Sequence, residues 1–434
     1  MEVCRSHKLH KKVIYIIKFV MYMAFFMGKR IGLRMTAALL AVFTLLTLPQ
    51  YVVADPVEPP KETSLYSKAC VLMDGESGRV LYGKNEALAL ANASTTKILT
   101  AIVCLEQTEL TDVVTASKKA ASQPKVHLGM REGEQFYVQD LLYAMMLESF
   151  NDCAMALAEH VGGSMEGFAA LLNEKAAQIG CTDTYFITPN GLDAEDDKGF
   201  HHTTATDLAR LMKYCCWDSP KAAEFLRITQ TASHSFTNLS GKSYAVSNKN
   251  AFLSMMPEAI SGKTGFTSAA GYCYVGAIES EGRRYTIALL ACGWPNHKTY
   301  KWSDAKTLFR YGMEHYRIEE IAFPENTYSV EVINGKRADA ALADWGRPVV
   351  LTAGMELPEA VQAYLLSEEE AFSYELELPG KVCRAVNAGD IVGKMQCYLN
   401  GECVAEVEIC LNEGSGQWDF RGLLSCFWTA YFTM

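Results

Sequence analysis

A serine and a lysine spaced three apart begin and end the first polar motif, Ser94-Thr95-Thr96-Lys97. Side chains at this spacing face the same way on a helix. A neutral lysine there can accept the serine proton, which makes the hydroxyl able to attack a carbonyl carbon. By itself the pair also fits a helix cap followed by a solvated lysine.

Two further motifs could complete such a site. Ser149-Phe150-Asn151 falls between two predicted helices, where a turn can aim both polar side chains into one site, although a helix cap is the alternative. Ser261-Gly262-Lys263-Thr264-Gly265 lies on a predicted strand whose glycines leave room for another backbone. A peptide could pair with that strand edge and Lys263 could bind a carboxylate, unless the lysine is simply exposed at a β-bulge.

The segments that must position these motifs alternate between strands and helices. Cys70–Asp74 and Arg79–Tyr82 flank a turn and predict a hairpin. Apolar periodicity predicts helices over 94–105, 141–147, 153–161, 165–179, 204–212 and 301–316, and strands over 258–265, 271–279 and 284–291. One antiparallel sheet packed between helices buries these faces most simply, so an α+β fold is predicted.

The residues after 318 change to a strand-rich pattern. Tyr328–Val332 and Phe372–Leu378 alternate along the chain, and Asn400-Gly401 joins two apolar runs as a hairpin turn does. We therefore expect a separate small all-β domain over 318–411.

The N-terminal segment has the pattern of a secretory signal. Basic residues at 29, 30 and 34 precede the apolar run Met35–Leu48, and small residues follow. We predict a signal peptide over 1–54 and a Pro-rich linker over 55–61. An earlier apolar stretch, Val13–Met27, leaves open a true start at Met27 or a retained membrane anchor; in either case the body would be exported.

The C-terminal tail, 412–434, is rich in aromatic residues. The stretch Gly422–Met434 carries no charge and is too short to cross a bilayer as a helix. Large aromatic residues at a chain end suit a membrane interface, so the tail predicts association with a membrane surface. A terminal strand or helix packed on the last domain is the alternative.

Composition narrows the class of protein. The chain has 434 residues and a net charge of −10, from 40 Lys plus Arg against 50 Asp plus Glu, which argues against nucleic acid as a partner. Its 14 cysteines are too sparse for a disulfide scaffold, and those at 104, 153, 273 and 292 lie in apolar runs, as core residues do. His201-His202 lacks a third ligand and predicts surface residues, so we predict neither a metal nor a cofactor.

The order Ser-x-x-Lys, Ser-x-Asn, Lys-Thr-Gly resembles that of the penicillin-binding serine enzymes and serine β-lactamases. Phe186–Asp193 and His202–Ala209 are similar to segments of the D-alanyl-D-alanine carboxypeptidases, whereas Phe150 stands where a small residue is commoner. The resemblance implies a β-lactamase/transpeptidase-like catalytic domain over 62–317. In that fold an antiparallel sheet is flanked by helices and joined to a helical subdomain, and the small all-β domain follows.

The resemblance implies catalytic roles for four residues. Ser94 attacks the carbonyl of a terminal D-Ala-D-Ala bond and forms an acyl-enzyme, with Lys97 as its base. Ser149 relays a proton to the leaving D-alanine, and Asn151 orients the peptide. Because Lys97 must be neutral to act as a base, we expect burial and the cation Lys263 to lower its pKa.

The resemblance also implies a substrate-binding strand. Lys263 and Thr264 hold the terminal carboxylate, and Gly265 leaves room beside them. The backbone N–H of Phe266 and that of the nucleophile hold the oxyanion. Lys301 matches the place where a second cation often helps to bind the carboxylate.

The predicted protein is an exported, penicillin-binding serine carboxypeptidase at the outer face of the cytoplasmic membrane or in the cell wall. It would remove the terminal D-alanine from peptidoglycan stem pentapeptides and would bind β-lactam antibiotics, and endopeptidase or transpeptidase action would use the same residues. A serine β-lactamase is one alternative, but it commonly uses a Glu-x-x-Leu-Asn base, absent between Ser149 and Lys263, where Glu195-Asp196-Asp197 predicts a solvated loop. A non-catalytic wall-binding scaffold is the other, and it would not need intact motifs.

Overall fold

The structure is a computed structural model that describes residues 58–432 apart from 322, 324–326, 338 and 359–362. The predicted signal peptide and the first residues of the predicted linker lie outside the described residues.

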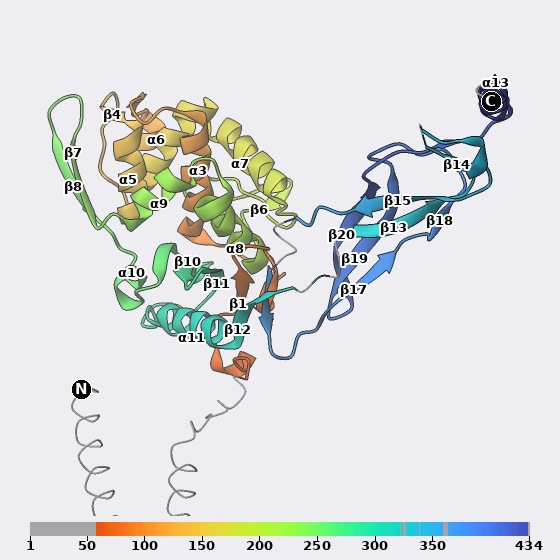
Figure 1. The fold of residues 1–434 in the computed structure, drawn as a ribbon. Helices are drawn as coiled ribbons and strands as arrows, with labels where there is room; N and C mark the ends of the chain where they lie inside the picture. The colour runs from red at the N-terminus through yellow and green to blue at the C-terminus, as the bar shows by residue number, and fades with distance from the viewer. Residues whose placement is uncertain (1–57, 322, 324–326, 338, 359–362, 433–434) are drawn as a thin grey trace, which may run out of the picture. The chain divides into compact units, whose positions relative to one another are not determined.

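A five-stranded antiparallel sheet forms the centre of the N-terminal part of the described chain (Figure 1). Its order is β2-β1-β11-β10-β9, so β1 pairs with a strand more than two hundred residues later in the sequence. The strands are β1 (Ala69–Asp74), β2 (Val80–Lys84), β9 (Ala259–Thr267), β10 (Gly271–Ser280) and β11 (Arg283–Leu290). The predicted hairpin and the three predicted strands are confirmed.

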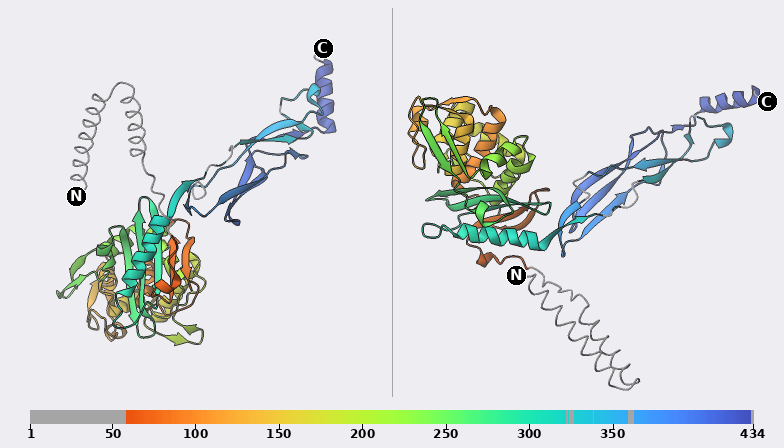
Figure 2. Two further views of the ribbon diagram at one scale, coloured as in Figure 1. Left: turned by 90° about the horizontal axis from the view of Figure 1, so that it is seen from below. Right: turned by 60° about the vertical axis from the view of Figure 1, so that its left-hand side comes forward.

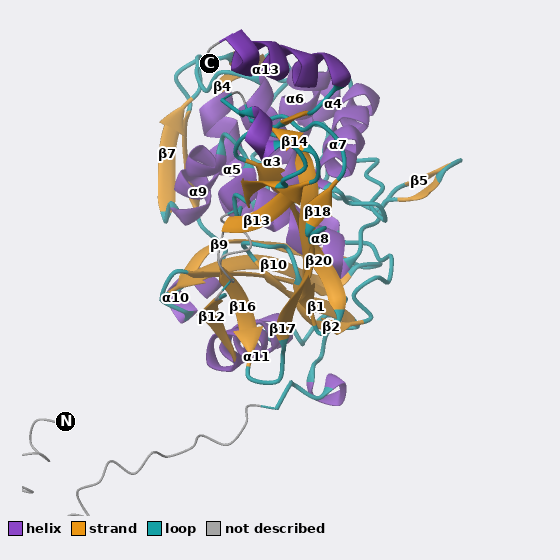
Figure 3. Cartoon of the chain, turned by 45° about the vertical axis from the view of Figure 1, so that its right-hand side comes forward, coloured by secondary structure: helices purple, strands orange, loops and turns teal. Residues whose placement is uncertain are grey.

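Helices cover both faces of this sheet, as Figures 2 and 3 show. Successive residues of β1 point to opposite faces: Val71 joins the core under the larger helices, and Leu72 joins the core under α11. The larger helices are α3 (Lys97–Gln107), α5 (Val138–Glu148), α6 (Asn151–Gly162), α7 (Met165–Ile179), α8 (Ala205–Lys213) and α9 (Ala222–Gln230). α11 (Tyr300–His315) lies on the opposite face, and α4 (Lys118–Ala121) and α10 (Phe252–Met255) are short.

The predicted helices form, with one difference at the first motif. The pattern predicts a helix from Ser94, but Ala93–Thr96 is a 3-10 turn and α3 begins at Lys97. Ala93 has a positive φ of 49°, which costs an L-residue energy and redirects the chain just before Ser94. Thr204 caps α8 by accepting a hydrogen bond from Asp207 N at 3.0 Å, as predicted.

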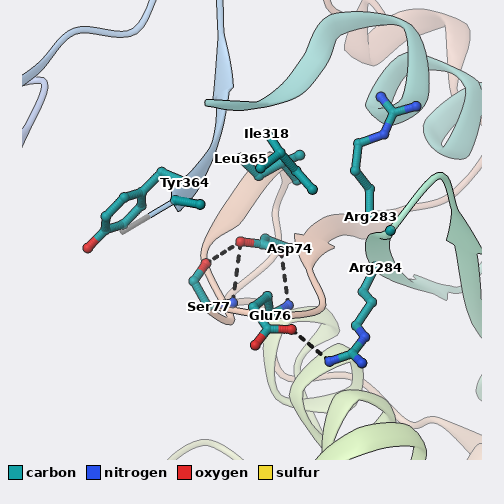
Figure 4. Close-up of a pocket in the computed structure, with 10 residues that line it drawn as sticks. Asp74, Glu76, Ser77, Arg283, Arg284, Ile318, Tyr364 and Leu365 are labelled. Atoms are coloured by element: carbon teal, nitrogen blue, oxygen red, sulfur yellow. Dashed lines mark hydrogen bonds and ion pairs between the residues drawn. The ribbon is translucent and has the colours of Figure 1, made fainter. Parts of the chain in front are cut away.

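Short hairpins and turns complete this part of the chain. The β1–β2 turn is held by Asp74, which accepts from Glu76 N at 3.0 Å, while Arg284 of β11 donates to Glu76 at 2.7 Å (Figure 4). The two-stranded pairs are β3 (Val113–Thr115) with β4 (Gln135–Tyr137), β5 (Glu195–Asp196) with β6 (Gly199–Phe200), and β7 (Ser233–Thr237) with β8 (Ser243–Ser247).

Between α11 and residue 417 the described chain is built mainly from β-strands. A six-stranded sheet has the order β17-β19-β20-β15-β13-β18, around a core that includes Val330, Leu351 and Ile409. Its strands are β13 (Thr327–Val332), β15 (Val349–Gly354), β17 (Phe372–Glu377), β18 (Lys381–Val382), β19 (Ile391–Leu399) and β20 (Glu402–Leu411). Two further pairs are β12 (Tyr316–Glu320) with β16 (Ala363–Ser367), and β14 (Gly335–Lys336) with β21 (Gly416–Gln417). The α+β fold followed by β structure is confirmed.

The predicted tail contains a helix, α13 (Phe420–Phe432). Its aromatic side chains are exposed, Phe427 to 62% and Tyr431 to 75%, and the rings of Trp428 and Phe432 stack with centroids 5.4 Å apart. Of the helices that the structure describes, none combines the length and the apolar character needed to cross a membrane.

Candidate active site

Lys97 lies at the centre of a group of polar side chains that come from three segments. Its Nζ donates to Ser94 Oγ and to Asn151 Oδ1, both at 2.8 Å, and lies 3.4 Å from Ser149 Oγ. Ser94 precedes α3, Ser149 follows α5, and Asn151 begins α6. The first two motifs therefore converge on one buried amine, which has no exposed surface.

Ser149 connects Lys97 to the third motif. Lys263 Nζ, on β9, donates to Ser149 Oγ at 2.8 Å and to the Thr264 carbonyl at 3.0 Å. Ser149 has a left-handed φ of 67°, a conformation that persists only where the surrounding structure holds it and that is common at functional sites. Phe150 fits this turn because its side chain is half-buried against the helical core.

β9 passes very close to Ser94. A Cβ on Gly265 would lie 2.9 Å from Asn92 O and 3.0 Å from Ser94 N, closer than side chains normally pack, so only glycine fits here. This approach brings the backbone at Gly265 and Phe266 beside that of Ser94. The Phe266 ring is 41% exposed and packs on Tyr272 with centroids 4.7 Å apart.

Burial controls the charge of both lysines. Burial, followed by the nearby Lys263 ammonium, holds the pKa of Lys97 well below its usual range. Burial also lowers the pKa of Lys263 to about 7. The lowered pKa of Lys97 favours the neutral amine against the Ser94 hydroxyl, and the amine beside Ser149 has a pKa close to neutral pH. That pairing can activate a serine for attack and deliver a proton to a leaving group.

Asn151 and its neighbour hold a loop over this group. Asn151 N donates to Val126 O at 2.8 Å, and its Nδ2 donates to Pro124 O at 3.2 Å. The buried Asp152 carboxylate accepts from Leu128 N and Gly129 N, each at 2.9 Å. The amide of Asn151 thus both contacts Lys97 and anchors the loop formed by residues 122–130.

Lys301 makes its contacts elsewhere. Its Nζ donates to Lys298 O and lies over the rings of Tyr272 and Trp302, 4.7 and 4.6 Å from their centroids. None of these contacts joins it to Lys97, so its role as a second cation stays a prediction.

The prediction that His201 lies on the surface is wrong. Its side chain is 2% exposed, its Nδ1 accepts from Ile187 N at 3.0 Å, and its Nε2 is 2.9 Å from Thr96 Oγ1. The ring also stacks on Phe186. Burial of a lone histidine gives no periodic signal, so the pattern could not reveal it. Among the described residues no cluster of His, Cys, Asp and Glu could hold a metal ion.

The cysteines at 104, 153, 273 and 292 are buried, as predicted. The motifs did not reveal one neighbour of Ser94, the residue Asn190. Its carbonyl oxygen accepts from Ser94 Oγ at 3.3 Å, and its side chain is almost fully buried. The only signal was the segment Phe186–Asp193, for which spacing suggested no role.

The fold and the Ser94–Lys97–Ser149–Lys263 group define a serine enzyme of the penicillin-binding class. The profile of the D-alanyl-D-alanine carboxypeptidase family matches residues 55–291. The chain is 35% identical over 246 residues to the D-alanyl-D-alanine carboxypeptidase DacB2 of Mycobacterium tuberculosis, covering 56% of this chain and 80% of that protein. It is 25% identical to DacF of Bacillus subtilis over 88% of this chain and 94% of DacF.

Solved structures share the fold. A D-alanyl-D-alanine carboxypeptidase from Mycobacterium tuberculosis superposes with a TM-score of 0.54 at 33% identity, over 60% of this chain and 95% of that one. Penicillin-binding protein 5 from Haemophilus influenzae shares the fold over 83% of this chain and 99% of its own, with a TM-score of 0.63 at 23% identity. The chain belongs to the D-alanyl-D-alanine carboxypeptidase family and is a penicillin-binding, serine-type carboxypeptidase.

Proposed function

We propose that Ser94 is the nucleophile and Lys97 its general base. Neutral Lys97 takes the Ser94 proton as Oγ attacks the carbonyl carbon of the terminal D-Ala-D-Ala amide. The negative charge that develops on the carbonyl oxygen is held by the backbone N–H groups of Ser94 and Phe266, which the close approach at Gly265 supports. Donors of this kind typically contribute about 3 kcal/mol each to the transition state.

Collapse of the tetrahedral intermediate breaks the carbon–nitrogen bond. We assign the proton that the leaving D-alanine nitrogen needs to Ser149, which donates its hydroxyl proton and regains the one that Lys97 took from Ser94, while Lys263 donates a hydrogen bond to Ser149 Oγ. The carboxylate of the leaving D-alanine binds to Lys263 and Thr264, and Asn151 orients the peptide. Water then hydrolyses the ester on Ser94 and releases the shortened peptide. The observation that carries this assignment is the set of contacts from Lys97 Nζ to Ser94, Ser149 and Asn151.

The substrate that fits this chemistry is a peptidoglycan stem pentapeptide ending in D-Ala-D-Ala. β-Lactams would acylate the same serine. We propose catalytic, small all-β and tail regions over 62–317, 318–411 and 412–434. The strand pair β14–β21 extends the β structure to Gln417.

We also propose export to the outer face of the cytoplasmic membrane or the cell wall, and peripheral membrane association through α13. The sequence pattern before residue 55 supports export. The exposed rings of Phe427, Trp428 and Tyr431 support insertion into a membrane interface, where aromatic side chains are favoured.

Labelling with a fluorescent penicillin and release of D-alanine from a stem pentapeptide test the residue roles together. Ser94→Ala should abolish labelling, and Lys97→Ala should slow acylation by about 10² to 10⁴, the usual contribution of a general base. Ser122→Ala is the matched control, because Ser122 and Lys125 repeat the Ser-x-x-Lys spacing on an exposed loop. Full acylation of the Lys97→Ala variant would contradict the role of Lys97 as the base.

The same assays separate the alternatives. Rapid hydrolysis of the penicillin, in place of a lasting acyl-enzyme, would indicate a β-lactamase. The absence of any labelling of the wild-type protein would favour a non-catalytic scaffold.

A further inference from the structure

The segment 187–192 packs closely against the turn that contains Ser94. His201 Nδ1 accepts from Ile187 N at 3.0 Å, and Thr100 Oγ1 of α3 donates to Pro189 O at 2.6 Å. Gly191 has a φ of 78°, and a Cβ there would overlap the carbonyl oxygen of Ala93. The segment is thus held against α3 on one side, and Asn190 lies at its centre.

Asn190 is the residue of this segment that reaches Ser94. Its carbonyl oxygen lies 3.3 Å from Ser94 Oγ. A carbonyl oxygen only accepts hydrogen bonds, so in the resting site the hydroxyl donates to it while Oγ accepts from Lys97, and the proton turns towards Lys97 Nζ when the amine acts as the base. These two partners hold Ser94 in one rotamer, with Oγ beside its base.

The side chain of Asn190 is anchored on the opposite loop. Its Nδ2 donates to Gln123 Oε1 at 2.9 Å, and its Oδ1 accepts from Leu192 N at 3.1 Å. Gln123 is half-buried, although its neighbours Ser122 and Pro124 are exposed. Gln123 therefore connects the 122–130 loop, which Asn151 also contacts, to the 187–192 segment.

We propose that the Gln123–Asn190 bridge is a positioning device: it fixes the Asn190 carbonyl and through it the Ser94 hydroxyl. The proposal rests on Ser94 being the nucleophile. Neither Gln123 nor the Asn190 side chain contacts the reacting atoms, so both act through Ser94. Loss of the bridge should lower the rate of acylation and leave peptide binding unchanged.

The test is the acylation rate of the full chain with a fluorescent penicillin, normalised by active-site titration so that only folded sites are counted. Gln123→Leu removes the acceptor at similar size, and acylation should slow about fivefold to tenfold, the usual effect of one lost hydrogen bond. Gln123→Glu keeps an accepting oxygen and should stay within about twofold of wild type. Ser122→Ala, on the same loop but with no contact to Asn190, should match wild type.

Two further measurements separate positioning from loss of structure. With a D-Ala-D-Ala peptide, Gln123→Leu should lower kcat at unchanged KM, and the pH midpoint should stay in place because no charge changes. If the leucine variant misfolds, Gln123→Ala, which only shortens the side chain, takes its place. A wild-type acylation rate for Gln123→Leu would overturn the proposed role of the bridge. So would a Gln123→Glu variant that is slowed as much as Gln123→Leu. A wild-type protein that is not acylated at all would instead overturn the proposed function.

Discussion

Gly191→Ala should damage the site from a position that touches no substrate. The residue has a positive φ, which an alanine adopts at a cost of about 1 to 2 kcal/mol. The new Cβ would also overlap Ala93 O and lie 2.8 Å from Thr96 Oγ1. Ala93 is the residue before Ser94, so the clash falls on the backbone that positions Ser94.

The size of the effect on stability and rate depends on the atom that the new Cβ would meet, the carbonyl oxygen of Ala93. A backbone carbonyl cannot move aside as a flexible side chain can, so the 187–192 segment must shift by about 1 Å. Overpacking of this kind costs about 2 kcal/mol beyond the φ term, which lowers the melting temperature by a further 4 to 8 °C, roughly. A displacement of about 1 Å in a reacting group can cost 10²-fold in rate, so acylation should slow by about tenfold to a hundredfold.

Gly163→Ala provides the control. Gly163 ends α6 with a φ of 70°, and no atom lies within 4 Å of its added Cβ. It therefore carries the φ cost without the clash, and its acylation rate should equal that of wild type. Thermal unfolding and penicillin acylation of both variants give the comparison. Equal melting temperatures and equal acylation rates for the two alanine variants would refute the reasoning.

Three further outcomes are expected. Because burial lowers the pKa of His201 to about 3, the unfolded chain takes up a proton that the native state refuses, so stability should fall by about 1.4 kcal/mol per pH unit as pH drops from about 6.5 towards 3. In denaturant titrations, the His201→Asn variant should no longer show this fall in stability at low pH. An unchanged slope of stability against pH would argue against His201 as its source. Asp152→Ala leaves partly buried N–H groups of the 122–130 loop unpaired and should cost about 2 to 3 kcal/mol in denaturant unfolding, whereas a loss under 1 kcal/mol would mean that water replaces the carboxylate. Changing Phe427 and Trp428 to serine should abolish cosedimentation with lipid vesicles and leave D-alanine release intact; retained binding would remove α13 as the membrane contact.

Local pattern was enough to find the elements and the motifs. The helices α5 to α8 follow from apolar periodicity, and the strands β9 to β11 follow from short apolar runs in a sheet that helices cover on both faces. Ser94 and Lys97 are three residues apart, so any helical turn brings them together. The start of α3 was misjudged because the positive φ of Ala93 has no marker in the sequence.

Distances between motifs were decided only by the tertiary structure. Ser94, Ser149 and Lys263 meet because the helices pack on the sheet in which β9 is an edge strand, and no spacing in the chain encodes that contact. The left-handed backbone of Ser149 and the low pKa of Lys97 likewise arise from their surroundings.

Asn190 and His201 show the same limit. Neither belongs to a motif with known chemistry, yet one accepts from the nucleophile and the other holds the segment that carries it. The sequence by itself determined the residue types and, through apolar periodicity, most of the helices and strands, whereas the class of reaction followed from the resemblance of its three motifs to a known family. Which side chains face one another was decided by long-range packing, in which each contact depends on the rest of the fold.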